Sequence, residues 1–208
     1  MNWLPKGFKG LGVWVEEVDL QRHMPDLLAL ESACFPDDMR DGAEEFLRLF
    51  EDPYAHGLLL FKDGKAIGLL SGTHLSENNT PDSVLELERI QSVEPQTFFI
   101  DNISMHPKAR SLRHIQYLFQ EMAIALKGFD YCYVSGHARI SNGWSRRVRR
   151  IFQAEVIAHI PDWHDFGEPF DYVLAEIDSV PIASNRYRFL QKLTGFIQRF
   201  RYRLCKVI

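Results

Sequence analysis

The sequence predicts a single α/β domain, with a mixed central sheet flanked by helices. Segments with a strand-like apolar pattern alternate with segments of helical spacing along most of the chain, which is typical of this class. The pair Asp63-Gly64 stands between two apolar runs, which indicates a β-hairpin. The chain has 208 residues, of which 46% are hydrophobic and 25% are charged, so it can enclose one substantial core.

The first half of the chain is expected to begin with a strand, because Val13 and Val15 alternate with Trp14 and Glu16. The elements expected in this half are a strand at 12–17, helices at 19–34 and 42–50, strands at 57–61 and 66–72, and a long polar loop at 76–96 with one helical turn around 84–90. Loops of this length in compact domains are usually functional or mobile.

The second half is expected to alternate strands and helices more regularly. Helix 111–127 has an apolar face that includes Leu112, Ile115, Leu118, Phe119 and Met122. The elements expected here are strands at 97–105, 131–135, 155–160 and 172–177, and helices at 111–127 and 142–152.

The last 28 residues differ from the body of the chain. Residues 181–208 contain seven Lys or Arg and no Asp or Glu, whereas the whole chain has a net charge of −4. Apolar residues recur at helical spacing from Tyr187 to Ile208. We therefore expect two parts, a domain at 1–180 and a basic amphipathic helix at 181–208. Such a helix binds a membrane surface, or packs on the domain or on a second subunit.

Several classes of protein are disfavoured by composition. Cys34, Cys132 and Cys205 are odd in number and far apart, which argues for reduced thiols and against a disulfide framework or a metal cluster. No apolar run is long enough to span a bilayer, and the amino-terminal segment is a poor signal peptide. The acidic body carries no recognised nucleic-acid motif. These features predict a cytoplasmic protein, with peripheral membrane binding through the last helix as an alternative.

The most informative stretch runs from Phe98 to Glu121. An apolar strand enters His106-Pro107, then a turn containing Lys108 and Arg110, and then an amphipathic helix. A strand that ends at a loop and continues as a helix leaves backbone N–H groups free to bind an anion. The basic side chains add positive charge at the same place.

This order of elements, over roughly residues 12–177, resembles the GNAT acyltransferase superfamily. In that family the strand leads into hydrophobic-x-Pro-x-x-Arg-Gly-x-Gly-x-Gly, whose backbone binds the coenzyme A pyrophosphate. Pro107 and Arg110 match this pattern, whereas Ser111, Arg113 and Ile115 stand where glycines are usual. The resemblance implies a set of residues that contact the acyl thioester, its pantetheine arm and its pyrophosphate: Ile103, Ser104, Met105, Lys108, Arg110, Ser111, Arg113 and His114.

Catalytic candidates follow from the same resemblance. Asp101 is the candidate general base, and burial near Phe98, Phe99 and Ile103 would raise its pKa; the alternative is a structural aspartate. Asn102 is expected to bind substrate or to fill the opposite face of the sheet.

Asn142 matches the family's asparagine at the start of the next helix. Arg149 stands where the family often has the tyrosine that acts as general acid. Candidates to replace that tyrosine are Tyr131, Tyr133 and Tyr172.

The function expected from these observations is acyl transfer from acetyl-CoA or another acyl thioester to an amine, without a metal. One alternative donor is an acyl carrier protein docked at a membrane surface, because Arg146, Arg147, Arg149 and Arg150 form a basic cluster. The other alternative is a catalytically silent scaffold with the same fold. Acceptor choice is expected to lie in 34–52 and 76–96, where acidic residues favour a cationic amine.

Overall fold

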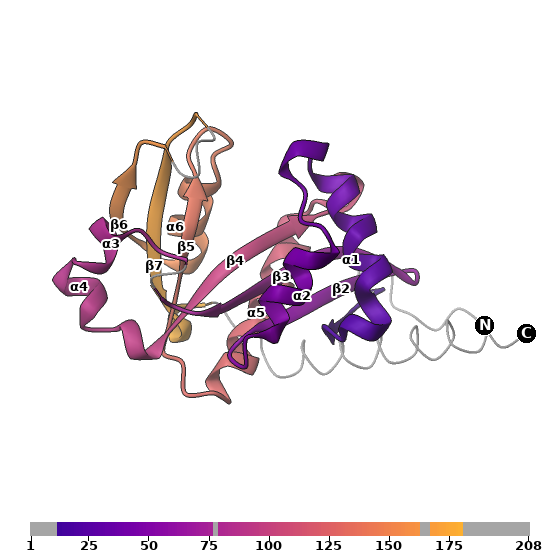
Figure 1. Ribbon diagram of the computed structural model, residues 1–208, viewed down its shortest axis with the longest axis horizontal. Helices are drawn as coiled ribbons and strands as arrows, with labels where there is room; N and C mark the ends of the chain where they lie inside the picture. Colours follow the sequence, from indigo (N-terminus) through magenta and orange to yellow (C-terminus); the bar gives the residue numbers. More distant parts are fainter. Residues whose placement is uncertain (1–11, 77–78, 163–166, 181–208) are drawn as a thin grey trace, which may run out of the picture.

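The computed structural model describes residues 12–76, 79–162 and 167–180 (Figure 1). Within these ranges seven strands form one sheet in the order β1-β2-β3-β4-β5-β7-β6. The strands are β1 (Val13–Glu17), β2 (His56–Lys62), β3 (Lys65–His74), β4 (Thr97–Met105), β5 (Tyr133–Arg139), β6 (Glu155–Ile160) and β7 (Phe170–Glu176). Neighbouring strands are antiparallel except β4 and β5, which are parallel. The expected mixed sheet is therefore confirmed.

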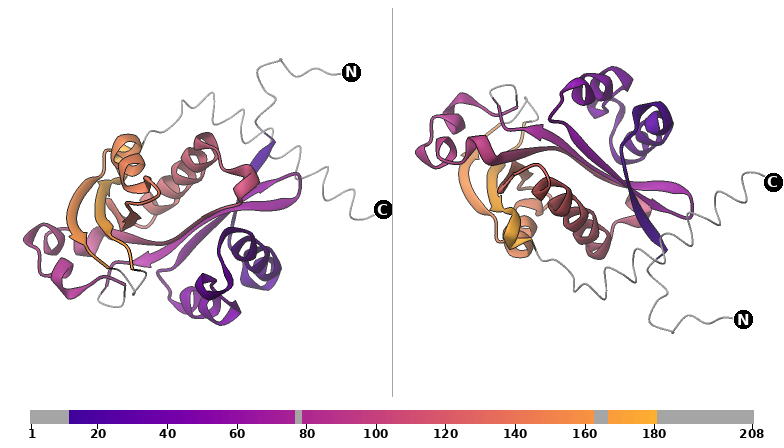
Figure 2. Two further views of the ribbon diagram at one scale, coloured as in Figure 1. Left: turned by 90° about the horizontal axis from the view of Figure 1, so that it is seen from above. Right: turned by 90° about the horizontal axis from the view of Figure 1, so that it is seen from below.

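Helices cover both faces of this sheet (Figure 2). They are α1 (Leu20–Cys34), α2 (Ala43–Glu51), α3 (Asp82–Leu85), α4 (Glu88–Gln91), α5 (Leu112–Lys127) and α6 (Trp144–Phe152). Helices α5 and α6 bury their apolar sides on one face, with Leu70, Phe98 and Val173. On the other face α1 and α2 pack on Leu59 and Leu69, and α3 and α4 pack on Phe99 and Tyr172. No helix in the described part of the chain is long and apolar enough to cross a bilayer.

The hairpin between β2 and β3 forms where the sequence predicts it. Asp63 and Gly64 have φ values of +50° and +77°, and Lys62 pairs with Lys65 across the turn. Positive φ at both central residues is the conformation that Asp-Gly favours, and its twist matches that of the strands. The hairpin fixes the register of β3 against β2, and β4 pairs with the other edge of β3.

A β-bulge interrupts β4 at Asp101. Asn102 pairs with Ser71 of β3, whereas Gly72 pairs with Ile100, so Asp101 is the extra residue. Gly72 is required here because a Cβ atom would lie 2.0 Å from the carbonyl oxygen of Phe99. A bulge of this kind bends the strand and increases its twist.

Beyond the bulge β4 leaves β5. The parallel pairing covers only Thr97–Ile100 of β4 with Tyr133–Gly136 of β5, although both strands continue. Figure 1 shows the two strands diverging from that point. The edge of β4 from Asp101 to Met105 therefore faces an opening in the sheet instead of a neighbouring strand.

The structure corrects three expectations about local structure. The loop at 76–96 contains two short α-helices, α3 and α4, and a 3₁₀ turn at Glu94–Gln96, where we expected one helical turn. Strand β5 runs from Tyr133 to Arg139, later than the expected 131–135. Strand β7 begins at Phe170, two residues before the expected start. The expected basic helix at 181–208, and the domain boundary before it, lie outside the described residues.

Replacing Gly72 with Ala is expected to destabilise the protein, because the added Cβ meets backbone atoms that cannot move aside. We expect the free energy of unfolding to fall by about 1–3 kcal/mol, as in other overpacked sites. Urea denaturation measures this loss. The matched control is Gly68→Ala on the same strand, whose Cβ would meet the flexible Met105 side chain. An equal or larger loss in the control would contradict the role given to Gly72.

Candidate functional site

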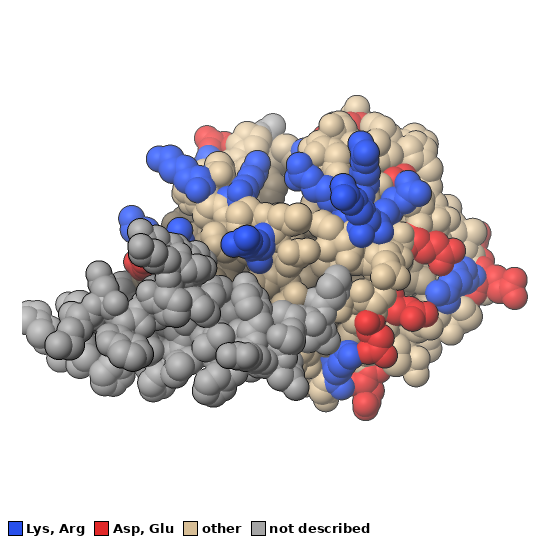
Figure 3. Space-filling view, turned by 180° about the vertical axis from the view of Figure 1, so that it is seen from behind, with Lys and Arg blue, Asp and Glu red and all other residues tan. Residues whose placement is uncertain are grey.

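The opening between β4 and β5 brings together most of the residues that the sequence singled out. The strand edge Asp101–Met105 forms one wall, and Arg110 to Arg113 begin the next helix directly after it. Figure 3 shows Lys and Arg side chains on both sides of a notch in the face viewed from behind. Beyond Ile100, no strand in the described part of the chain pairs with this side of β4, and positive charge surrounds the opening.

The turn into α5 offers backbone donors at the mouth of this opening. Ser111 is the N-cap of α5, and its Oγ accepts a hydrogen bond from the N–H of His114 at 3.2 Å. Among the described residues, no acceptor binds the N–H groups of Arg110, Ser111, Leu112 and Arg113. With respect to the described residues, Leu112 and Arg113 thus offer free N–H groups in the first turn of a 16-residue helix, and those of Arg110 and Ser111 precede them, which suits the binding of an anion.

The basic side chains of this turn differ in their contacts. Lys108 and Arg113 are exposed, whereas Arg110 donates from Nε to the carbonyl oxygen of Met105 at 3.1 Å. The ring of His114 contacts the carbonyl oxygen of Ala109 at 2.8 Å. Arg110 and His114 thus shape the turn, while Lys108 and Arg113 leave their charge in solution beside the free N–H groups.

A buried polar cluster lies on the α1 side of β4. Asn102 Nδ2 donates to Glu31 Oε1 and to Asp41 Oδ2, each at 3.1 Å. Ser104 Oγ lies 2.9 Å from Glu31 Oε1 and 2.6 Å from Asn102 Oδ1. Glu31 is only 1% exposed, so this carboxyl is removed from water by α1 and the sheet.

The Glu31 carboxyl accepts hydrogen bonds from both neighbouring side chains of β4. Ser104 Oγ and Asn102 Nδ2 each donate to its Oε1. Burial raises the pKa of Glu31, and the charge of Asp41 adds to this, while the hydrogen bonds from Ser104 and Asn102 oppose it. Burial is the largest of these effects, so the pKa of Glu31 lies above its ordinary value.

The expected burial of Asp101 is wrong. Its side chain is exposed because the bulge turns this residue away from the faces on which Ile100 and Asn102 lie. The neighbouring Asn102 is the residue that enters a buried network, which agrees with the expectation that it either contacts substrate or fills the opposite face.

The segment before α6 holds the other expected catalytic residue. Asn142 is exposed, and its Oδ1 accepts the N–H of Trp144 at 2.9 Å, which stabilises the turn into α6. Of the tyrosine candidates, Tyr131 and Tyr133 lie at the closed end of the opening, because Tyr133 pairs with Thr97. Tyr172 is fully buried, and burial raises its pKa. The general acid therefore remains unassigned.

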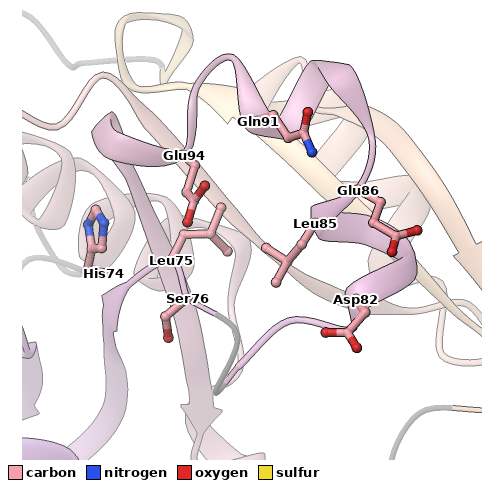
Figure 4. Close-up of a pocket in the computed structure, with 8 residues that line it drawn as sticks. All are labelled: His74, Leu75, Ser76, Asp82, Leu85, Glu86, Gln91 and Glu94. Atoms are coloured by element: carbon pink, nitrogen blue, oxygen red, sulfur yellow. The ribbon is translucent and has the colours of Figure 1, made fainter.

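Two concave regions lie outside the opening. One of about 580 Å³ lies at the end of β3 and under α3 and α4 (Figure 4), and its carboxylates are Asp82, Glu86 and Glu94. The other, of about 500 Å³, lies along α6 and is lined by Arg146, Arg149 and Arg150. The first concavity is in the segment expected to choose the acceptor, and the second is in the expected basic cluster.

Glu31 and Asp41 are the residues that sequence reasoning missed. Asn102 lies 71 positions after Glu31, so only the fold brings them together. One signal was present: Glu31 falls on the apolar stripe of α1 with Leu27, Leu30 and Cys34, at helical spacing. A carboxyl on a buried stripe needs partners across the interface, which here are Asn102 and Ser104.

Solved N-acetyltransferase structures share this fold. The ribosomal-protein-S18-alanine N-acetyltransferase from Escherichia coli aligns with a TM-score of 0.61 at 10% identity, over 83% of this chain and 97% of its own. An N-acetyltransferase from Staphylococcus aureus Mu50 gives 0.60 at 12% identity, over 79% and 98%. A Salmonella typhimurium structure with its cofactor acetyl-CoA gives 0.58 at 14%, over 80% and 95%.

The chain therefore has the GNAT N-acetyltransferase fold, as its resemblance to that superfamily implied. No sequence-family model matches it, and no curated protein matches it in sequence. The likeness lies in the arrangement of the strands and helices, at sequence identities of 10–14% in these three structures.

The raised pKa of Glu31 predicts a pH-dependent difference in stability between the protein and its Glu31→Gln variant. A pKa raised above the unfolded value of about 4.3 gives stability that is complete below that pH and is lost as pH rises through the folded value. The glutamine cannot ionise, so the wild type should lose stability relative to it as the pH rises above about 4.3. The slope is at most about 1.4 kcal/mol per pH unit.

Urea denaturation at several pH values measures this difference. The matched control is Glu44→Gln, at an exposed position in the first turn of α2. A wild type that gains stability over Glu31→Gln as pH rises would show that Glu31 is ionised in the folded protein.

Proposed function

We propose that this protein is an N-acyltransferase that moves an acyl group from acyl-CoA to an amine. The observation that carries the proposal is the divergence of β4 from β5 beside the free N–H groups that begin α5. An unpaired strand edge can hydrogen-bond an extended amide-containing arm, and the helix start can bind its phosphates. The likeness in fold to N-acetyltransferases supports the same chemistry.

Acyl-CoA suits the two ends of this site. Its pantetheine arm would pair with the edge of β4 at Ile103 and Met105, and its pyrophosphate would lie at the N–H groups of Arg110 to Arg113. Lys108 and Arg113 are exposed and add charge there. Ser111, Arg113 and Ile115 stand where the family has glycines, and their side chains leave the pyrophosphate less room to approach the backbone. Binding of the pyrophosphate would therefore depend more on the charges of the basic side chains.

The acceptor would approach from the face that α1 and α2 cover. That face carries Asp41 and Asn102 beside the opening, and the acidic concavity under α3 and α4 lies on the same face. Direct attack by an amine requires a deprotonated nitrogen, a polarised carbonyl and good positioning. The carboxylates on this face suit a cationic amine as the acceptor.

A carrier protein is the second candidate donor, and the concavity on α6 favours it. Three exposed arginines line that concavity, and among the described residues none of them forms an ion pair. An acidic carrier docked there would deliver the pantetheine arm without a nucleotide, which removes the need for the family's glycines. Membrane binding through 181–208 remains a prediction, as does the scaffold alternative.

The proposal predicts that acetyl-CoA binds with micromolar affinity in calorimetry and that transfer to an amine panel releases free thiol. Arg113→Glu should weaken acetyl-CoA binding about tenfold, equivalent to about 1.4 kcal/mol, because it reverses a charge beside the pyrophosphate site. The matched control is Arg48→Glu on the exposed side of α2. Absence of binding at millimolar acetyl-CoA would exclude the acyl-CoA donor.

The carrier donor predicts a different pattern. Arg150→Glu should slow transfer from an acylated carrier protein at least tenfold and leave the rate with acyl-CoA unchanged, because only the carrier contacts α6. Transfer assays with both donors measure this at low and raised salt, since steering by charge weakens with ionic strength. Equal effects on the two donors, or no effect on either, would argue against a carrier docked on α6.

A further inference from the structure

One buried hydroxyl beside the polar cluster has no partner in the described part of the chain. Ser71 of β3 is 0% exposed, and its Oγ makes no hydrogen bond to any described residue. Ser71 lies directly opposite Asn102 in the antiparallel pair, and side chains of opposite residues lie on the same face. The Ser71 side chain therefore lies on the same face of the sheet as the Glu31–Asn102 cluster, and a buried polar group without a partner is costly.

Asp41 is the only carboxyl of this cluster that is partly exposed. Its side chain accepts from Asn102 Nδ2 at 3.1 Å, and its backbone N–H donates to Glu31 Oε2 at 3.4 Å. The adjacent Arg40 does not neutralise it. That guanidinium pairs with Asp37 and donates to the carbonyl oxygens of Phe35 and Ser32. Hydrogen bonds to Asn102 and Glu31 thus hold Asp41 in place, and the residue is partly exposed on the face that α1 and α2 cover.

We propose that Asp41 binds the ammonium group of the acceptor and takes its proton, with Ser71 Oγ accepting a second N–H. This inference rests on the proposed acyl transfer and names its proton acceptor. Glu31, Asn102 and Ser104 position the Asp41 carboxylate through the contacts of the cluster. The base is thus Asp41, in the segment between α1 and α2. It is not the exposed Asp101 of β4, which the sequence favoured.

The proton balance of the step is complete. The ammonium gives one proton to Asp41, and the neutral nitrogen then forms the C–N bond to the thioester carbonyl carbon as the C–S bond breaks. The departing thiolate takes the second proton, so the products are an amide and a thiol. Asp41 releases its proton to solvent, and the net reaction frees one proton.

The charged and titratable groups around Asp41 are few among the described residues. Glu31 and Cys34 face the cluster from α1, and the pKa of Cys34 is raised to about 11 by burial and by Glu31, so the thiol stays neutral. Arg40 comes from the segment before α2, and Arg110 comes from the turn after β4.

The first test is the binding of butylammonium chloride to the ¹⁵N-labelled full chain without a thioester. The side-chain NH₂ signals of Asn102 report on the cluster directly. We expect saturable shifts in the wild type, at least tenfold weaker binding in Asp41→Asn and weaker binding in Ser71→Ala. Asparagine can still accept from Asn102 Nδ2, so Asp41→Asn should fold, which its urea midpoint checks. Glu176→Gln, at the exposed end of β7 and outside both acceptor segments, is the matched control and should bind as the wild type does.

The second test is the kinetics of acyl transfer. Asp41→Asn should lower kcat/KM by about 10²–10⁴-fold, as expected for the loss of a general base, and leave the Kd for acetyl-CoA unchanged. Full activity in Asp41→Asn, or butylammonium shifts that are absent or independent of Asp41, would overturn the proposal. Binding that depends on Asp41 in a chain that transfers no acyl group would support the ammonium site and reject the proposed function.

Discussion

The site depends on a single interruption of backbone pairing. At Asp101 the bulge changes the register of β4 against β3, and after Ile100 β4 no longer pairs with β5. At the bulge the backbone of Phe99 comes very close to Gly72, which is possible because Gly72 has no Cβ atom. Everything proposed for this protein requires the resulting strand edge, because a continuous sheet would bond all of these backbone groups internally.

The same interruption determines which side chains of β4 lie on each face of the sheet. After the bulge, Ile103 and Met105 face the core under α5, whereas Asn102 and Ser104 face α1. Positive charge and free N–H groups gather at the start of α5, and carboxylates gather beside α1. A polyanionic donor and a cationic acceptor would therefore meet at the opening from different directions, each attracted by the opposite charge.

The sequence predicted the parts of the fold that depend on local pattern. The apolar run of β4 predicted its bounds, and Asp63-Gly64 predicted the hairpin. It could not show the bulge, because a single extra residue reverses which face each later side chain takes without altering composition. This is why Asp101 was expected inside and lies outside.

The polar cluster could not be predicted from local sequence pattern for a different reason. Glu31, Asp41 and Asn102 meet only because α1 packs across β4, and no short motif joins them. The short helices α3 and α4 have four residues each, too few for a helical period to be read. Arg149, at the position where the family often has a tyrosine, is exposed and lines the α6 concavity, so the structure leaves the general acid open.

Hydrogen–deuterium exchange with and without acetyl-CoA tests the central claim most directly, because it reports on individual backbone N–H groups. The account predicts slowed exchange at Asp101–Met105 and at Arg110–Arg113, with no change at the exposed turn of Asp63 and Gly64. Unchanged exchange along β4 and at the start of α5, at acetyl-CoA concentrations that saturate binding elsewhere, would contradict the claim that the divergence of β4 and β5 forms the donor site.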